Sequence, residues 1–238
     1  MNGAPLAVLC AGAAKALVFA ASERFALRDG GCRIEARFGP VGTMRDALAA
    51  GAPCDVLLVT ESLARELAAG GVLDGATLRV VGSVPTAVAV RAGAAHPPVG
   101  SEGELRDALL AATAIHVPDL ARSTAGQHVL RVLDRLGIRD RVAPKLHGHA
   151  GGGAAAMPAL AADGDAALGI AQATEIAYSA GVEHVASLPE AFGLETVYAA
   201  AVTGVARDPR AGRRFVDFIA GPDCAARRTA AGFGAAEP

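Results

Sequence analysis

The stretch that decides the fold is residues 6–25, LAVLCAGAAKALVFAASERF. Its first five residues are continuously apolar, which is typical of a strand buried on both faces. Small residues follow, and then apolar residues recur at helical spacing as far as Leu27. A strand that runs into a helix in this way leaves the first helical N–H groups without intrahelical partners. The backbone at Gly12 and Ala13 is therefore a candidate anion site, with an ordinary strand-to-helix turn as the alternative.

Length and composition limit the classes of protein to consider. The 238 residues allow one large domain or two of about a hundred residues each. The chain is 52% hydrophobic, so it can bury a sizeable core, and its net charge is −2. That charge argues against nucleic acid or an anionic membrane as the main partner. No run approaches the roughly 18 apolar residues of a membrane span, so the protein is not expected to cross a membrane.

The N-terminus and the cysteines bear on the compartment. The chain begins without a basic segment, so we expect a periplasmic protein if a signal peptide has been removed and a cytoplasmic one otherwise. The four cysteines are widely spaced and form no C-x-x-C pair: Cys10, Cys32, Cys54 and Cys224. This spacing predicts no zinc site, and Cys10 and Cys54 are expected to be small core residues. No cofactor is predicted.

Three strand–loop–helix units fill the first 70 residues. The second has the loop GPVGT at residues 39–43, where Thr43 is a candidate N-cap for a helix over 44–50. The third has a strand at 56–59 and a helix at 63–69. This order predicts a parallel sheet, in which ligands bind beyond the carboxyl ends of the strands.

Two long extended runs, at residues 78–90 and 194–203, suggest crossings between two α/β lobes. Pro85 lies in the first run and should prevent an uninterrupted central strand there. We therefore expect residues 1–82 and 200–238 to form lobe I and residues 83–199 to form lobe II. Inside lobe II, Ser101 and Glu104 have the spacing of a capping box.

Lobe II repeats the opening arrangement. A strand at 114–118 leads through the loop DLARSTAG to a helix that stops at Gly137, and a strand at 166–170 leads to Gln172. Between them, His147-Gly148-His149 is interpreted as part of a mobile glycine-rich loop rather than a metal site. Pairing Ser123 with His116 or His128 would suggest a hydrolase, but the chain has no G-x-S-x-G elbow.

These segments resemble, in order from residue 6 to about 230, the molybdate-binding proteins of ABC transporters. The first unit, VLCAGAAKAL at 8–17, is similar to the family's opening loop and helix. Residues 43–56, TMRDALAAGAPCDV, contain the most specific match, G-A-P-x-D-V. In lobe II, residues 123–127, STAGQ, are similar to the family's P-A-G loop, and residues 164–170, GDAALGI, to its G-x-A-x-x-G-I strand.

The resemblance implies the two-lobe type II periplasmic binding-protein fold, an α/β fold with a ligand cleft between the lobes. It implies a solute-binding protein, not an enzyme, that closes on a small oxyanion such as molybdate or tungstate and presents it to an ABC permease as a monomer. The alternatives are a cytoplasmic sensor for a small anion or organic acid and an enzyme on the same scaffold. For the enzyme, Asp55 and Glu61 are the carboxylates to examine.

The expected ligand-binding residues supply neutral donors at the mouth between the lobes. They are Gly12, Ala13, Gly42, Thr43, Ser123, Thr124, Gly126 and Gln172. Helix capping alone is the alternative role for Thr43 and Ser123, and a surface loop position is the alternative for Gln172. Tyr198 could line the cleft, although a core position is favoured.

Three departures from the family pattern bear on selectivity. Gly12 replaces a hydroxyl-bearing residue, residues 40–43 replace a serine-rich loop, and Gln172 replaces a tyrosine. An amide offers an acceptor that an oxyanion cannot use. We therefore expect weaker molybdate binding than in the family, and a ligand such as a protonated oxyanion or a small organic acid.

Overall fold

The computed structural model describes residues 4–235. Residue contacts divide the chain into unit 1, residues up to Val84 and from Val197 onward, and unit 2, Pro85–Thr196. Both boundaries fall inside strands, β4 (Arg79–Arg91) and β9 (Glu195–Val202). The predicted boundaries at 82/83 and 199/200 differ slightly from those observed at 84/85 and 196/197.

Unit 1 is built on the predicted parallel strands. β1 (Leu6–Ala11) lies between β2 (Ile34–Gly39) and β3 (Val56–Thr60) and is parallel to both. β9 returns antiparallel to β3. Every residue of β1 and β3 is buried, as the continuous apolar runs predicted.

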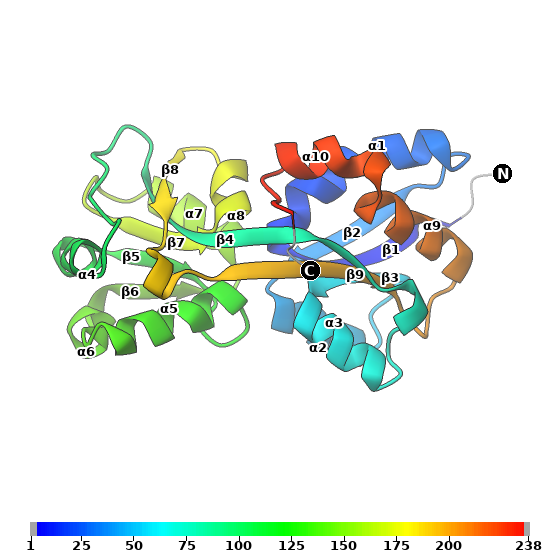
Figure 1. Cartoon of the computed structure of the whole chain (residues 1–238), viewed down its shortest axis with the longest axis horizontal. Coiled ribbons are helices and arrows are strands. Elements are labelled where there is room, and N and C mark those ends of the chain that lie inside the picture. The colour runs from blue at the N-terminus through cyan, green and yellow to red at the C-terminus, as the bar shows by residue number, and fades with distance from the viewer. Residues whose placement is uncertain (1–3, 236–238) are drawn as a thin grey trace. The chain divides into compact units, whose positions relative to one another are not determined.

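Helices cover both faces of this sheet (Figure 1). The helices α2 (Val41–Ala49) and α3 (Glu61–Ala69) pack on one face. The other face is covered by α1 (Lys15–Arg28), α9 (Pro209–Ala220) and α10 (Ala225–Ala230). Phe25 joins α1 to α9 through ring contacts with Phe215 and Phe218, at centroid distances of 5.1 and 5.6 Å.

Unit 2 has its own parallel core. β5 (Ile115–Pro118) is parallel to β6 (Leu146–His149) on one side and to β7 (Leu168–Gln172) on the other. β4 is antiparallel to β7, and β8 (Val182–Ser187) also pairs with β4. The carboxyl ends of β5, β6 and β7 therefore lie at one edge.

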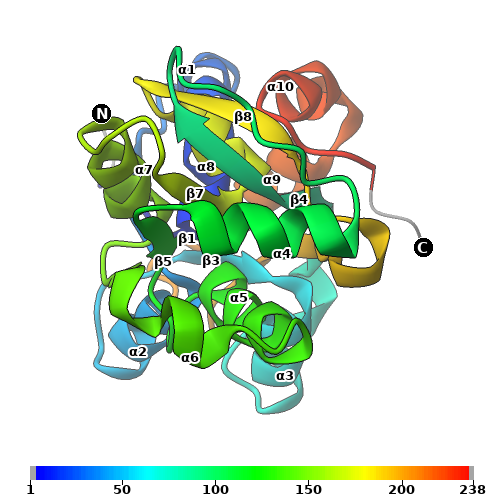
Figure 2. The ribbon, with the colours of Figure 1, turned by 90° about the vertical axis from the view of Figure 1, so that its left-hand side faces the viewer.

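The helices of unit 2 also form two layers (Figure 2). An apolar cluster joins α4 (Glu102–Ala111), α5 (Thr124–Arg135) and α6 (Arg139–Val142) to one face of the sheet. A second cluster, rich in alanine, places α7 (Gly153–Ala161) and α8 (Ala173–Tyr178) on the other. Short 3-10 turns complete the two units at Gly12–Ala14, Gly75–Thr77, Ala143–Lys145, Glu190–Phe192 and Pro222–Cys224.

The structure confirms some local predictions and corrects others. Ser101 and Glu104 form the predicted capping box, and Cys10 and Cys54 are buried. The predicted interruption at Pro85 is wrong, because β4 runs through it. The proline is tolerated because the pairing of β4 with β7 begins one residue later, at Thr86.

The histidine-containing loop is also corrected. Residues 146–149 are not a mobile loop but the strand β6, paired in parallel with β5. Gly148 fits this strand because a Cβ there would lie only 2.8 Å from the side chain of Leu120. The glycine therefore indicates close packing, which a sequence pattern does not distinguish from flexibility.

Candidate functional site

The predicted residues of unit 1 lie where β1 and β2 end. Gly12 opens the 3-10 turn Gly12–Ala14 ahead of α1, and no side-chain hydrogen bond caps that turn. The first backbone bond of α2 runs from Met44 N to Pro40 O at 3.0 Å. The N–H groups of residues 41–43 therefore precede the helix's own bonds, and this edge offers backbone donors.

Thr43 is not the N-cap that the sequence predicted. α2 begins at Val41 with Pro40 in the N-cap position and without a side-chain cap. The helix starts earlier because the fixed φ of proline suits the entry to a helix and its missing N–H costs nothing there. Gly42 and Thr43 thus lie in the first turn and are partly exposed.

In unit 2, the residues predicted after β5 have structural roles. Ser123 is the N-cap of α5, and its hydroxyl accepts from the N–H of Gly126 at 3.4 Å. A Cβ on Gly126 would lie 2.2 Å from the carbonyl oxygen of Asp119, so only glycine fits there. Thr124, the first residue of the helix, is partly exposed. Capping and close packing thus account for Ser123 and Gly126, and ligand contact by these residues stays a prediction.

Gln172 ends β7 in a buried polar cluster. The residue is 3% exposed, which rules out a surface loop position, and its Nε2 donates to Thr196 Oγ1 at 3.0 Å. Among the residues described, three buried oxygens here have no hydrogen-bond partner: Gln172 Oε1, Thr86 Oγ1 and Thr174 Oγ1. Buried polar atoms normally find partners, so this cluster has capacity to bind a ligand or water.

The loop after β6 and the carboxylate beside it are not among the residues predicted from the sequence. Gly153 begins α7, and the side chain of Glu175 packs so closely that a Cβ on Gly153 would lie 2.3 Å from its Cδ. Burial raises the pKa of Glu175 to about 7, although backbone N–H groups of Gln172 and Gly153 oppose the shift. The run Gly151-Gly152-Gly153 before an alanine-rich helix repeats the opening arrangement and could have revealed this loop.

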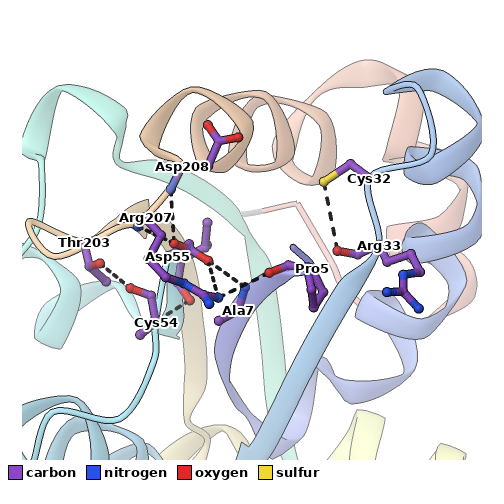
Figure 3. A network of polar contacts seen from close by, with 10 residues as sticks. Pro5, Ala7, Cys32, Arg33, Cys54, Asp55, Thr203, Arg207 and Asp208 are labelled. Atoms are coloured by element: carbon purple, nitrogen blue, oxygen red, sulfur yellow. Dashed lines mark hydrogen bonds and ion pairs between the residues drawn. The ribbon is translucent and has the colours of Figure 1, made fainter. Parts of the chain in front are cut away.

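Asp55 and Glu61 are the candidate carboxylates for an enzyme, and Asp55 has a structural role (Figure 3). It is 2% exposed and lies at the amino end of β3, away from the edge where ligands bind parallel strands. Its oxygens accept from the backbone N–H groups of Ala7 at 2.7 Å and Arg207 at 2.6 Å, and the Arg207 guanidinium lies 3.4 Å away. Glu61, on α3, pairs with Arg65 at 2.6 Å.

The residues considered for a hydrolase, Ser123, His116 and His128, form hydrogen bonds with other groups rather than with one another. His128 Nε2 lies 2.7 Å from the carbonyl oxygen of Phe192, and His116 contacts Asp163 and His149. With its hydroxyl on Gly126, Ser123 has the geometry of a helix cap rather than of an activated nucleophile. Tyr198 is in the core of unit 1, edge-on to Phe233 at 5.9 Å.

Within residues 4–235, no helix is long and apolar enough to span a membrane. In the same part of the chain, no three His, Cys, Asp or Glu side chains are arranged to hold a metal ion.

Comparison with known proteins bears on the family and the fold of the chain. The model of the bacterial extracellular solute-binding protein family matches residues 6–234. The periplasmic molybdate-binding protein of Azotobacter vinelandii superposes with a TM-score of 0.79 over 98% of this chain and 100% of that one, at 19% identity. The sulfate-binding protein SubI of Mycobacterium tuberculosis gives 0.77 over 99% and 88%, at 18% identity.

A curated sequence relative has a different description. An aconitate isomerase from a Pseudomonas species is 27% identical over 185 residues, which are 75% of this chain and 66% of that protein. The chain thus spans slightly less than two thirds of that relative. The structural neighbours confirm the predicted α/β fold of the periplasmic binding-protein type.

Proposed function

Because the chain belongs to the family of bacterial extracellular solute-binding proteins, we propose that it is the binding component of an ABC transporter and that its ligand is a small anion. The predicted ligand residues are all uncharged, and both units offer N–H donors at the carboxyl ends of parallel strands. Such donors suit oxyanions and carboxylates, which they hold without a fixed counter-charge.

The observation that carries this proposal is the cluster around Gln172. Its amide is buried and bonded to Thr196 on one side only. With Nε2 on Thr196, the amide presents a carbonyl to a ligand that bears a proton; turned over, it presents an NH₂ group to an anionic oxygen. An organic acid with carboxylate and hydroxyl groups can use either form, so we favour it over molybdate.

A thermal-shift panel tests the ligand class. It compares molybdate, tungstate, sulfate and phosphate with citrate and cis- and trans-aconitate. A ligand present at 100 times its Kd stabilises the folded state by about 2.7 kcal/mol, which raises the Tm measurably. We expect the largest shift from an organic acid. No shift with any of these anions would contradict the proposal.

Two site variants, at Gln172 and Gly12, and one control variant locate the site by calorimetry. Gln172→Ala should weaken the best ligand by about 1–3 kcal/mol, whereas Thr229→Ala, on an exposed threonine of α10 in unit 1, should change nothing. Gly12→Ser restores a hydroxyl in a turn that serine readily adopts, and should strengthen molybdate binding by about 0.5–3 kcal/mol. Tight wild-type binding of molybdate that neither variant alters would exclude this assignment of residues.

A second candidate is an isomerase acting on an aconitate-like acid. It is favoured by Glu175, because a carboxyl group with a pKa of about 7 can exchange protons near neutral pH. The similarity to an aconitate isomerase agrees with it. Incubation with cis-aconitate, followed by proton NMR, distinguishes the two: a trans product that Glu175→Gln abolishes supports the enzyme, and unchanged substrate supports a binding protein.

The first proposal also implies an oligomeric state, a location and a partner. A binding component would work as a monomer outside the cytoplasmic membrane and dock on a permease. Light scattering tests the monomer, and stimulation of permease ATPase activity by the ligand-loaded protein tests the docking.

A further inference from the structure

Unit 2 contains a hydrogen-bonded series of three side chains that the proposed function does not use. His116 of β5 places Nε2 2.8 Å from Asp163 Oδ2 and Nδ1 3.0 Å from His149 Nε2, at the end of β6. We call Asp163, His116 and His149 the histidine relay. His116, the middle member, is buried with 7% of the residue exposed, whereas 38% of the Asp163 side chain is exposed.

The carboxylate of Asp163 determines which ring nitrogens of His116 and His149 carry protons. The bond with His116 lowers the pKa of Asp163, so this carboxylate is ionised and can only accept. His116 must then carry its proton on Nε2, and when neutral it accepts on Nδ1. His149 must therefore donate from Nε2, which leaves a lone pair on its Nδ1.

The surroundings keep His149 neutral at rest. Burial lowers the pKa of His149, and His116 and His147 lower it further. The ring of His147 stacks on that of His116 at a centroid distance of 5.3 Å. The helix that packs on this strand, α7, contains no titratable residue, and the side chain of Glu175 lies against its first residue, Gly153.

The outer end of the relay lies at the edge where unit 2 offers its donors. His149 is the last residue of β6, and its carbonyl oxygen accepts from the N–H of Gly152 at 2.9 Å. The next residue, Gly153, begins α7, a helix of 9 residues without a side-chain cap. β5 and β7 run parallel to β6 and end at the same edge. The loop after β5 contains Ser123, and Gln172 is the last residue of β7.

We infer that His149 is the charged contact for a carboxylate ligand, and that it takes up one proton when that ligand binds. The proton comes from the solvent and adds to Nδ1, while Nε2–H stays on His116 and no bond between heavy atoms changes. Asp163, through His116, stabilises the imidazolium that forms. This inference rests on the proposed function, since it assumes an anion at this edge.

The linkage predicts how affinity changes with pH. Above the pKa of free His149, binding that requires one proton should weaken about tenfold for each pH unit. Calorimetry with citrate and trans-aconitate in two buffers of different ionisation enthalpy should give an uptake close to one proton per ligand. Binding with no uptake and no dependence on pH between 6 and 8 would overturn the inference.

Variants separate the relay from general charge effects. His149→Gln should remove the pH dependence and Asp163→Asn should shift it to lower pH, because the imidazolium loses its support. His184→Gln, on an exposed histidine of β8, should leave the dependence unchanged. Equal slopes in all of these proteins would also overturn the inference.

A measurement without ligand keeps the two proposals apart. Nitrogen-15 NMR of the histidine rings reports which nitrogen carries the proton, and we expect His149 as the Nε2–H tautomer, changed by Asp163→Asn. If no anion binds but this tautomer is found, the proposed function fails and the relay stands. If His149 is found as the Nδ1–H tautomer, the relay fails whatever binds.

Discussion

In both units, parallel strands end at one edge of a sheet, but different chemical groups lie at that edge. In unit 1, strands β1, β2 and β3 run into helical turns that have no side-chain cap, so the edge offers backbone N–H groups. In unit 2, the strands lead to a capping serine, a buried glutamine, a carboxyl group and the histidine relay. Under the proposed function, unit 1 would supply backbone donors that suit any small anion, whereas the groups that could select a ligand or take up a proton lie in unit 2.

The largest expected effect comes from Asp55, the buried carboxylate of unit 1 that accepts hydrogen bonds from two backbone N–H groups. Asp55→Ala leaves the N–H groups of Ala7 and Arg207 unsatisfied, and should lower the free energy of unfolding by about 3–5 kcal/mol. Arg207→Ala should cost less than about 1 kcal/mol, because that side chain is 56% exposed. Urea denaturation measures both. A loss below about 1 kcal/mol for Asp55→Ala would show that unit 1 does not depend on this network.

Next in size is a glycine of unit 2. Gly126→Ala drives a Cβ into the backbone of Asp119, and should cost about 3 kcal/mol or more. In unit 1, a Cβ at Gly39→Ala would lie 2.8 Å from the end of the unbranched Met44 side chain, which can shift more easily than backbone, and Gly164→Ala meets nothing within 4 Å. Both should be far better tolerated in thermal unfolding. Similar costs for all three would mean that backbone contact does not explain Gly126.

Glu175 gives a pH-dependent effect. Its pKa is raised from 4.5 to about 7, so the native state holds an extra proton between these values and wild-type stability falls as the pH rises through them. Glu175→Gln resembles the protonated form and should be more stable than wild type by about 1–3 kcal/mol at pH 8, with little difference at pH 4.5. Glu190→Gln, on an exposed glutamate, serves as control in denaturation at both pH values.

The smallest effect compares two hydroxyls, one in each unit. Ser123→Ala removes a cap and should cost about 1 kcal/mol. Thr43→Ala removes none, and should change stability by only a few tenths of that value. Equal losses in thermal unfolding would mean that the edges of the two units are capped alike.

The sequence predicted the framework well where one physical requirement dominates. Residues 6–10 are apolar without interruption, and the result is a fully buried parallel strand. The spacing of Ser101 and Glu104 predicts a capping box because both hydrogen bonds are local. Helix α1 likewise buries Leu17, Val18, Ala21 and Phe25, the residues that its periodicity selects.

The candidate site was harder to predict from the sequence, because its properties depend on pairing between strands that are distant along the chain. His116 and His147 are neighbours only because β5 and β6 align in that register. Gln172 is buried because β7 pairs with β4, and the high pKa of Glu175 depends on its contact with Gly153. Thr43 was misplaced for a local reason, since threonine suits both an N-cap and the first helical turn.

The discontinuity of unit 1 has a kinetic consequence. Unit 2 is a single stretch of chain, whereas unit 1 needs β9 beside β3, and Arg207 must find Asp55 across 152 residues. Contacts this distant in sequence close slowly, so the inserted unit should be able to fold while unit 1 still lacks a strand. A chain emerging from a ribosome or a translocation channel would thus pass through a state with one finished unit, and the edge of β3 would stay exposed until the last quarter of the polypeptide arrives.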